Sequence, residues 1–291
     1  MRSQHPLFRK FPLAGSATTS EGIVPTPYHI YDGNGVFIGG SASLSAVQEL
    51  LRDEYVTPVE TTGNKTPMGI WVCNFTDASL GPHHELQFSF FTAEDKSVLV
   101  PSHQLSLISL MTRPDVRMLC HGLWNNTPRV VAYNRERLSL NARLCGSQIG
   151  NDKQTFSFDF HDSVAGGSIL SGDLLKRVSL RAAWDLVSHL GLRRTVAIAR
   201  QPWIKLAILN PTGVLLSTNE VAESYTKNQK NLVRYFDEGK DRLEFGDTPY
   251  ARLGFEPQFV QDMEGFRFVY LNPGVNTGIR ESTFAANQRR K

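Results

Sequence analysis

The sequence predicts a mainly β (α+β) fold: an antiparallel sheet, curled or closed on itself, with a few helices on its outside. Short segments of alternating polar and apolar residues recur along most of the 291 residues and are separated by Pro, Gly and Asn signals. Helical periodicity is confined to a few widely separated stretches, whereas a parallel βαβ design would alternate helices with strands throughout. Many short strands in series are typical of sheets that curl or close.

We expect three regions along the chain. Residues 1–27 are rich in Ser, Thr, Gly and Pro, which predicts an N-terminal arm with little regular structure. Residues 28–275 form a single β-barrel domain, and residues 276–291 are a loose basic tail. A turn at Asp32-Gly33-Asn34-Gly35 is predicted near the start of the domain, because Gly beside Asx is a strong hairpin signal.

Three helices are predicted from the spacing of apolar residues and from capping signals. The first spans residues 44–52, where Ser43 or Ser45 can cap it. The second and longest spans 172–190, with Ser171 placed to cap it and Gly191 to end it. The third is a polar helix at 219–236. Alternation predicts strands at 36–38, 70–75, 86–91, 98–101, 116–121, 129–133, 138–144, 155–160, 195–199, 204–209, 214–216, 243–245 and 266–271.

The composition excludes several classes of protein. Hydrophobic residues make up 41% of the chain and charged residues 20%, which allows a sizeable buried core. The net charge of +3 is scattered, so we expect no nucleic-acid or membrane partner. No apolar run approaches the length of a membrane span, and the N-terminus lacks a secretory signal, which predicts a cytoplasmic protein. The three cysteines have no Cys-x-x-Cys spacing, which indicates neither a disulfide framework nor a zinc ribbon.

A polar cluster stands where a Gly81-Pro82 turn leads into the strand at 86–91. The cluster is His83, His84 and Glu85. Side chains alternate across a strand, so Leu86, Phe88 and Phe90 share one face, while Glu85, Gln87, Ser89 and Phe91 share the other. The first face is core, and the second faces solvent or lines a cavity. In an enclosed site the pKa values of this cluster could shift until one group served as acid and another as base near neutral pH.

Motifs for metals and cofactors are absent from the sequence. Adjacent His83 and His84 on an extended segment point to opposite faces, and there is no His-x-His or His-Glu-x-x-His, so we expect no metal site. There is no Gly-x-Ser-x-Gly elbow, no phosphate loop and no Gly-x-Gly-x-x-Gly after a strand. These absences count against a serine hydrolase, a nucleotide enzyme and a dinucleotide oxidoreductase, and we expect no cofactor.

The order of these motifs over roughly residues 28–274 resembles the acetoacetate decarboxylase-like superfamily. The family has an aromatic-x-Glu where this chain has His83-His84-Glu85, and a Gly-Arg-Glu-x-Trp/Tyr-Gly-x-Pro-Lys stretch where this chain reads Gly122-Leu123-Trp124-Asn125-Asn126-Thr127-Pro128-Arg129. The resemblance implies a conical, largely antiparallel β-barrel around a central cavity, in a homo-oligomer. Further matching segments are the helix at 44–52, Tyr250–Phe255, Pro257 and Phe266-Arg267-Phe268-Val269.

One departure from the family pattern bears on the reaction. Family decarboxylases use the lysine after the proline as a Schiff-base nucleophile, and here that position is Arg129. Arginine stays protonated and cannot form the imine. Leu123 also stands where the family often has Glu. The resemblance therefore implies a divergent member that lacks the Schiff-base lysine, with Glu85 as its matched acidic residue.

The resulting hypothesis is a cofactor-free lyase or isomerase of secondary metabolism. It would dehydrate, isomerise or cyclise a β-dicarbonyl or polyketide-like small molecule by acid–base catalysis. Glu85, with His83, would move protons, and Arg129 would hold a substrate oxyanion across the cavity from Glu85. Four further residues are expected to bind the substrate: Gln87, His121, Trp124 and Tyr133.

Two alternatives stay open. A Schiff-base decarboxylase or aldolase-type enzyme could use a relocated lysine, for which Lys176 and Lys205 are the candidates. A barrel of this kind could also carry a hydrophobic ligand without catalysing a reaction.

Overall fold

The computed structural model describes residues 5–54, 56–93, 99–100, 105–111, 113, 115–150, 154–161, 167–175, 178–209 and 221–271. A 13-stranded sheet dominates this part of the chain. Its strands are β3 (Tyr28–Ser43), β5 (Lys65–Ala78), β6 (His83–Ala93), β8 (Val116–Asn125), β9 (Ala142–Ile149), β10 (Thr155–Phe160), β11 (Ser168–Asp173), β12 (Ile204–Leu209), β13 (Val221–Lys227), β14 (Lys230–Tyr235), β15 (Arg242–Phe245), β16 (Glu256–Glu264) and β17 (Arg267–Tyr270).

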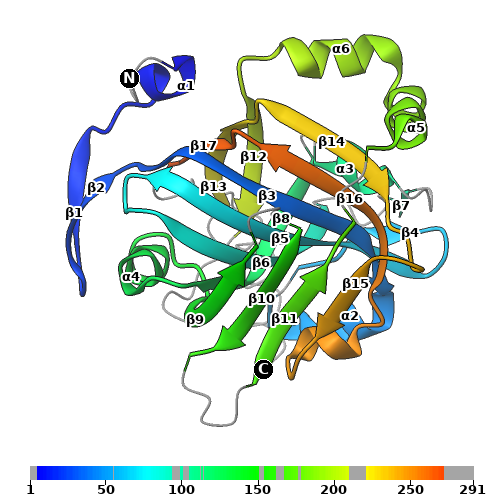
Figure 1. The fold of residues 1–291 in the computed structure, drawn as a ribbon, viewed down its shortest axis with the longest axis horizontal. Helices are drawn as coiled ribbons and strands as arrows, with labels where there is room; N and C mark the ends of the chain where they lie inside the picture. The colour runs from blue at the N-terminus through cyan, green and yellow to red at the C-terminus, as the bar shows by residue number, and fades with distance from the viewer. Residues whose placement is uncertain are drawn as a thin grey trace, which may run out of the picture.

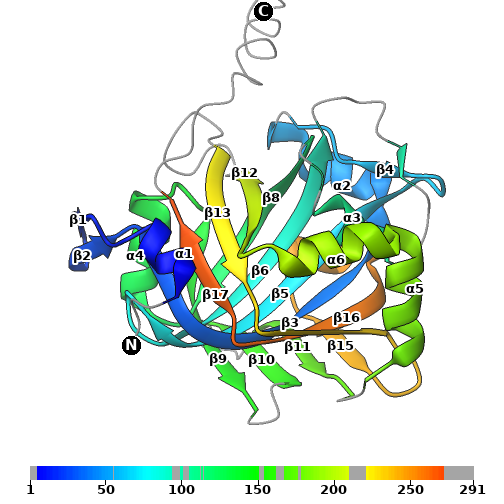
Figure 2. The same cartoon turned by 90° about the horizontal axis from the view of Figure 1, so that it is seen from above.

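The sheet curls back on itself (Figures 1 and 2). Strands pair in the order β12-β13-β17-β3-β5-β6-β8, and β12 also pairs with β8 through Ile208 with Met118 and Leu209 with Leu119. The pairings of these seven strands therefore form a ring. Most pairs are antiparallel, while β8–β9 and β8–β12 are parallel. The predicted mainly β fold with a curled, largely antiparallel sheet is confirmed.

Two apolar cores lie on the two faces of the curled sheet. The inner core contains Phe37, Phe91 and Phe259. The outer core contains Leu86 and Phe88 of β6, covered by side chains of β10 and β11, which cross that face together with α2 (Leu44–Leu50). The alternation expected along β6 is confirmed, because its even-numbered apolar residues lie in the outer core and its odd-numbered residues face inward.

The predicted turn at Asp32-Gly33-Asn34-Gly35 is wrong, because β3 is one strand of 16 residues that passes straight through it. Its register with β5 shifts on both sides of Asp32. A Cβ atom at Gly35 would lie 2.3 Å from the carbonyl oxygen of Val72 on β5. Glycine here permits close approach of two backbones in a bent strand, a role that the sequence does not distinguish from a turn.

The segment expected to be an N-terminal arm carries regular structure in its described part. It contains α1 (Pro6–Lys10) and a hairpin of β1 (Gly15–Thr19) and β2 (Gly22–Thr26). Figure 1 shows this hairpin beside α4 (Pro128–Glu136). The side-chain hydroxyl and the backbone N–H of Ser20 both donate to the Glu136 carboxylate, which ties the hairpin to that helix.

The first predicted helix is confirmed and the second is partly wrong. Ser43 caps α2 by accepting from the backbone N–H of Ala46. The stretch 172–190 begins as the end of β11, and the helix α5 (Leu180–Leu190) starts later, capped by Ser179. Gly191 ends it with φ of +80°, as expected.

Three other segments were assigned the wrong type of structure. Residues 129–133, expected as a strand, lie in α4, which Pro128 starts at its first turn. Residues 195–199, also expected as a strand, lie in helix α6 (Leu192–Arg200). The polar helix expected at 219–236 is instead the strands β13 and β14. The strand predicted at 214–216 lies outside the described residues.

Smaller elements complete the described part of the chain. They are η2 (Arg52–Glu54), β4 (Glu60–Thr61), β7 (Leu99–Val100), α3 (Ser106–Leu110) and η3 (Pro249–Arg252). Among the described helices, none combines the length and the apolar character that a membrane crossing requires.

Candidate functional site

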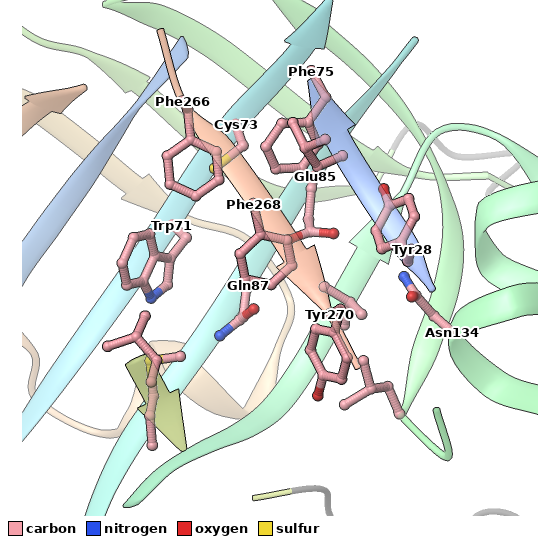
Figure 3. A pocket seen from close by; sticks show the side chains of 15 residues that line it. Tyr28, Trp71, Cys73, Phe75, Glu85, Gln87, Asn134, Phe266, Phe268 and Tyr270 are labelled. Carbon is pink, nitrogen blue, oxygen red and sulfur yellow. The ribbon is translucent and has the colours of Figure 1, made fainter. Parts of the chain in front are cut away.

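A hollow lies inside the curled sheet, on the side of the inner core. It has an empty volume of about 600 Å³, counting the part that is open to solvent. Strands β3, β5, β6, β8, β12 and β17 and helix α4 each contribute side chains to its lining (Figure 3). Most of the lining is aromatic or aliphatic. Its polar members include Tyr28, Glu85, Gln87, Asn134 and Tyr270.

Glu85 lines the hollow and is its only carboxylate among the described lining residues. Burial raises the pKa of Glu85 to about 7, because the charged form loses its hydration. Asn125 Nδ2 donates a hydrogen bond of 3.0 Å to Glu85 Oε2, which acts in the opposite direction on this pKa by favouring the carboxylate. Glu85 is thus able to gain or lose a proton near neutral pH, as a general acid or base must.

Two buried asparagines hold this carboxylate in place. Asn134 Nδ2 on α4 donates to Asn125 Oδ1 at 3.0 Å, and Asn125 then donates to Glu85. Both asparagine side chains are almost fully buried, so their orientation is fixed by these bonds. Asn125 lies directly opposite Glu85 in the ladder between β6 and β8, which explains the contact.

His83 lies next to the hollow, behind Tyr28. The Tyr28 hydroxyl is 2.6 Å from His83 Nε2, and His83 Nδ1 is 2.9 Å from the carbonyl oxygen of Gly81. A carbonyl only accepts, so Nδ1 carries the proton, and Nε2 accepts from Tyr28. Burial lowers the pKa of His83 to about 4, which keeps it neutral at pH 7. His83 therefore orients Tyr28, which lines the hollow.

Gln87 lies where expected, on the inner side of the sheet, whereas Tyr133 lies in α4 and does not reach the hollow as expected. Gln87 lines the hollow and donates from Nε2 to Ser89 Oγ at 2.6 Å. Figure 3 shows Glu85 and Gln87 projecting from the same strand. Tyr133 is fully buried in the inner core, with its ring 5.6 Å from that of Tyr28, and it supports the wall and does not line it.

Arg129 is not in the hollow, contrary to expectation. Its side chain is exposed, and its guanidinium donates to the carbonyl oxygen of Ile23 at 3.2 Å. Arg129 was expected in the hollow because the resemblance puts it at the position of the family's lysine, and residues 129–133 were also assigned to a strand. In the first turn of α4 the residue after Pro128 faces the β1–β2 hairpin outside the sheet. The proposed pairing of Glu85 with Arg129 across a cavity is therefore wrong.

His121 and Trp124 lie on the opposite face of β8, also contrary to expectation. Trp124 pairs with Leu86 and packs in the outer core, 2% exposed and edge-on to Phe88. His121 stands at a shift in register, and its Nδ1 is 2.8 Å from the Tyr250 hydroxyl. Burial lowers the pKa of His121 to about 4. Neither residue lines the hollow.

Several lining residues were missed from the sequence. Phe266, just before β17, and Phe268 and Tyr270 within it all face the hollow, because every second residue of an extended chain points to the same side. Alternation in the predicted last strand was a sufficient signal for them. Trp71 could have been found in the same way on β5. The roles of Asn125 and Asn134 carried no local signal, since they depend on the contact between β6, β8 and α4.

No lysine or arginine is present among the described residues that line the hollow. Lys205 is exposed on β12, where the next residue, Leu206, lines the hollow, so the two side chains point to opposite faces. Lys176 lies outside the described residues. No three His, Cys, Asp or Glu side chains within the described ranges are grouped as a metal site would require.

Comparisons with known proteins bear on the fold. No family model matches the sequence, and no curated protein matches it significantly. The acetoacetate decarboxylase of Legionella pneumophila is similar in structure, with a TM-score of 0.56 and 11% identity over 92% of this chain and 94% of that one. A second acetoacetate decarboxylase structure gives a TM-score of 0.50 and 14% identity, covering 85% and 87% of the two chains.

A third similar structure is the enduracididine biosynthesis enzyme MppR complexed with pyruvate. Its TM-score is 0.53 at 7% identity, and the match covers 88% of this chain and 96% of that one. At such low identity these likenesses concern the fold alone. The chain has the fold of acetoacetate decarboxylase over nearly its whole length, as the resemblance implied.

Proposed function

We propose that this chain is a cofactor-free enzyme that moves protons on a small carbonyl compound, as a lyase or isomerase. Glu85 is the general base and acid, and its position in the hollow is the observation that supports the proposal most strongly. The similar structures include enzymes with this fold, an acetoacetate decarboxylase and MppR, which is consistent with catalysis here.

The chemistry follows from the groups around the hollow. As a carboxylate, Glu85 takes a proton from the carbon next to a substrate carbonyl, and the electron pair moves to the oxygen to give an enolate. Return of the proton from Glu85 to another carbon is an isomerisation. Its transfer from Glu85 to the departing β-hydroxyl group, as the enolate collapses to the enone, releases water and is a dehydration. A carboxyl group with a pKa near the working pH serves both directions of proton transfer well.

Asn134 can donate to the substrate's carbonyl oxygen, and Tyr28 can accept from a hydroxyl group of the substrate. The Tyr28 hydroxyl donates to His83 and keeps its own lone pairs for a donor on the substrate. Asn134 lines the hollow and has a second N–H besides the one given to Asn125. In this proposal His83 is a positioning residue for Tyr28, which revises its expected role as a proton carrier.

The test uses exchange and dehydration of simple substrates. Hydrogen exchange next to the carbonyl of 2-heptanone in heavy water, followed by proton NMR, reports enolate formation. Conversion of 4-hydroxyheptan-2-one to the enone reports loss of water. Glu85→Gln should lower both rates by roughly 10²- to 10⁴-fold, because it removes the general base. In the native protein the rate should rise with pH through about 7, as Glu85 loses its proton.

Glu256→Gln is the matched control, since Glu256 is an exposed acid at the start of β16 and should leave both rates unchanged. Equal rates for Glu85→Gln and the native protein would contradict the proposal.

The mainly apolar lining also favours a second candidate, a barrel that binds a hydrophobic ligand without reaction. Ligand binding with no turnover in either assay would support that candidate. Trapping of a carbonyl ligand by borohydride would instead support a lysine nucleophile.

A further inference from the structure

A second space lies beside the hollow, between the helices α5 and α6 and the curled sheet. It has an empty volume of about 1300 Å³, counting the part that is open to solvent, and we call it the vestibule. Its walls include Leu186 and Leu190 of α5, Ile198 of α6 and Met263 of β16. Figure 2 shows α5 and α6 lying over the strands at this side of the sheet.

The vestibule adjoins the hollow. Trp71, Leu206 and Phe266 line both spaces. On the ladder between β5 and β6, Trp71 pairs with Gln87 and Cys73 pairs with Glu85. The junction at Trp71 therefore lies two residues along β5 from Cys73, the partner of Glu85, an offset along the strands of about 7 Å at roughly 3.4 Å per residue. A molecule bound at Glu85 therefore needs to be only a few bonds long for its other end to enter the vestibule.

The helices over the vestibule are fastened to the sheet. The Tyr235 hydroxyl of β14 donates to Asp185 on α5 at 2.6 Å. Lys227 of β13 donates to the backbone carbonyls of Ala199 and Gln201 at the end of α6, at 3.2 and 2.6 Å. These bonds hold both helices above a mainly apolar wall, of which Lys227 itself forms part, so the vestibule is a built part of the fold.

The charges around the hollow restrict which ligand groups can bind next to Glu85. Above about pH 7 Glu85 is a carboxylate, and the described lining of the hollow offers no lysine or arginine to pair with a second one. A bound anion would lose its hydration and lie beside a group of the same charge. An uncharged carbonyl group faces neither penalty.

We propose that the hollow and the vestibule form one continuous site for an uncharged carbonyl compound with an apolar tail. The carbonyl end lies at Glu85, and the tail passes Trp71 and Phe266 into the vestibule beneath α5 and α6. The placement of the carbonyl end rests on the proposed function, whereas the tail site rests on the two adjoining spaces.

Trp71 adds a polar contact at the junction. Its indole Nε1 is buried and has no hydrogen-bond partner among the described residues. A buried donor without an acceptor is costly, so a ligand oxygen that accepts from it is stabilised. This favours a compound with an oxygen between its reacting end and its tail, such as a β-diketone or β-hydroxy ketone.

Calorimetric titration of the full chain with 2-pentanone, 2-heptanone and 2-nonanone tests the tail site. Affinity should rise about threefold to fourfold for each added methylene that enters the vestibule. Heptanoate and nonanoate, which carry a carboxylate in place of the ketone, should bind at least tenfold more weakly than the ketones of the same length at pH 8. An affinity that does not change with chain length would overturn the tail site, and equal binding of the carboxylates would overturn the uncharged head.

Two leucines provide a matched pair of variants. Leu190→Gln changes a vestibule residue and should flatten the dependence on chain length, while 2-pentanone binds as before. Leu192→Gln changes a leucine of α6 that is 68% exposed and is not part of the vestibule wall, and it should keep the native dependence. Equal behaviour of the two variants would contradict the proposal.

Trp71→Phe separates the polar contact from the tail site. It should weaken the binding of heptane-2,4-dione several-fold and leave the chain-length dependence of the simple ketones intact. Unchanged binding of the dione would exclude Trp71 as a donor. All of these measurements are of binding, so they remain decisive if the native protein turns over neither substrate or if Glu85→Gln leaves the rates unchanged.

Discussion

The proton affinity of Glu85 is set by two opposing effects at one point of the structure. Burial in the hollow raises its pKa to about 7, and the hydrogen bond from Asn125 restrains that rise. The same bond fixes the direction of the carboxylate. Asn125 is therefore the side chain through which the reactivity of Glu85 can be adjusted without removing the carboxylate itself.

Asn125→Ala should raise the pKa of Glu85 further above its ordinary value. The substitution removes a donor that favours the charged form and leaves the burial in place. The midpoint of the pH–rate profile for enone formation should then move to higher pH. Carbon-13 NMR titration of the labelled Glu85 carboxyl measures the same shift directly.

Asn141→Ala serves as the control for this prediction, because Asn141 lies outside the chain of bonds from Asn134 to Glu85. Its midpoint should match that of the native protein. A midpoint for Asn125→Ala at or below the native value would show that the bond does not restrain the pKa.

A buried ion pair joins several elements at one end of β14. Arg234 donates from two nitrogens to both oxygens of Asp241, at 2.6 and 2.8 Å, with the two side chains 5% and 0% exposed. Asp241 also accepts from the backbone N–H groups of Leu175 and Asp237. The carboxylate thus connects β14, the loop after it and the segment after β11. Burial alone would raise the pKa of Asp241, but these bonds, that of Arg234 foremost, hold it below its usual value.

Asp241→Asn should lower the free energy of unfolding by roughly 3 to 5 kcal/mol, because it leaves the buried guanidinium of Arg234 without its counter-ion. Urea denaturation at pH 7 measures this loss. Glu264→Gln is the control in the pair of strands β14 and β16. It breaks a half-exposed pair with Lys230, 3.3 Å long, and should cost less than about 1 kcal/mol.

The lowered pKa of Asp241 determines how the stability of the native protein and of Asp241→Asn depends on pH. Asp241 contributes stability above its unfolded pKa of about 4, and this contribution is lost as the pH falls through the lower folded pKa. Acid should therefore destabilise the native protein more than Asp241→Asn, and the two should converge at low pH. Parallel loss of stability in both would contradict this assignment.

The curled sheet keeps a carboxyl group inside a mostly apolar hollow, and the whole molecule is less stable for it. The folded pKa of Glu85 lies above its unfolded value, so its favourable contribution is present below about pH 4 and is lost as the pH rises through about 7. Above that pH Glu85 is charged in the folded protein, and its lost hydration lowers the free energy of unfolding. Retaining such a group where a neutral one would be more stable is typical of functional sites.

Glu85→Gln should therefore be more stable than the native protein at pH 8, by at most about 3 kcal/mol. Below the folded pKa both proteins carry an uncharged side chain there, so the difference should shrink strongly by pH 5. Thermal unfolding at the two pH values measures it. A variant that is less stable at pH 8 would show that the carboxylate is stabilised in the hollow, and would weaken its role as a base.

The homo-oligomer expected from the resemblance stays a prediction.

Alternation and spacing were enough to predict the mainly β fold, the helix α2, the end of α5 at Gly191 and the single face of β6 that Glu85 and Gln87 share. Each depends on the chain within a few residues, where backbone geometry alone decides which side chains share a face. The site around Glu85 could not be predicted in this way. Arg129 was placed in the cavity from its match to the family's lysine position, and neither that match nor a local pattern shows where a strand ends and a helix begins. His121 and Trp124 were misplaced because a local pattern does not show which face a register shift selects.

The partners of Glu85 come from contacts between distant segments. Asn125, Tyr28 and the aromatic residues of β17 reach the hollow only because the sheet curls and brings β3, β6, β8 and β17 around one space. Desolvation there, and with it the pKa of about 7, is a property of that enclosure. Local sequence determined which face Glu85 occupies, and the tertiary structure decided that this face is enclosed, because burial depends on every strand around it.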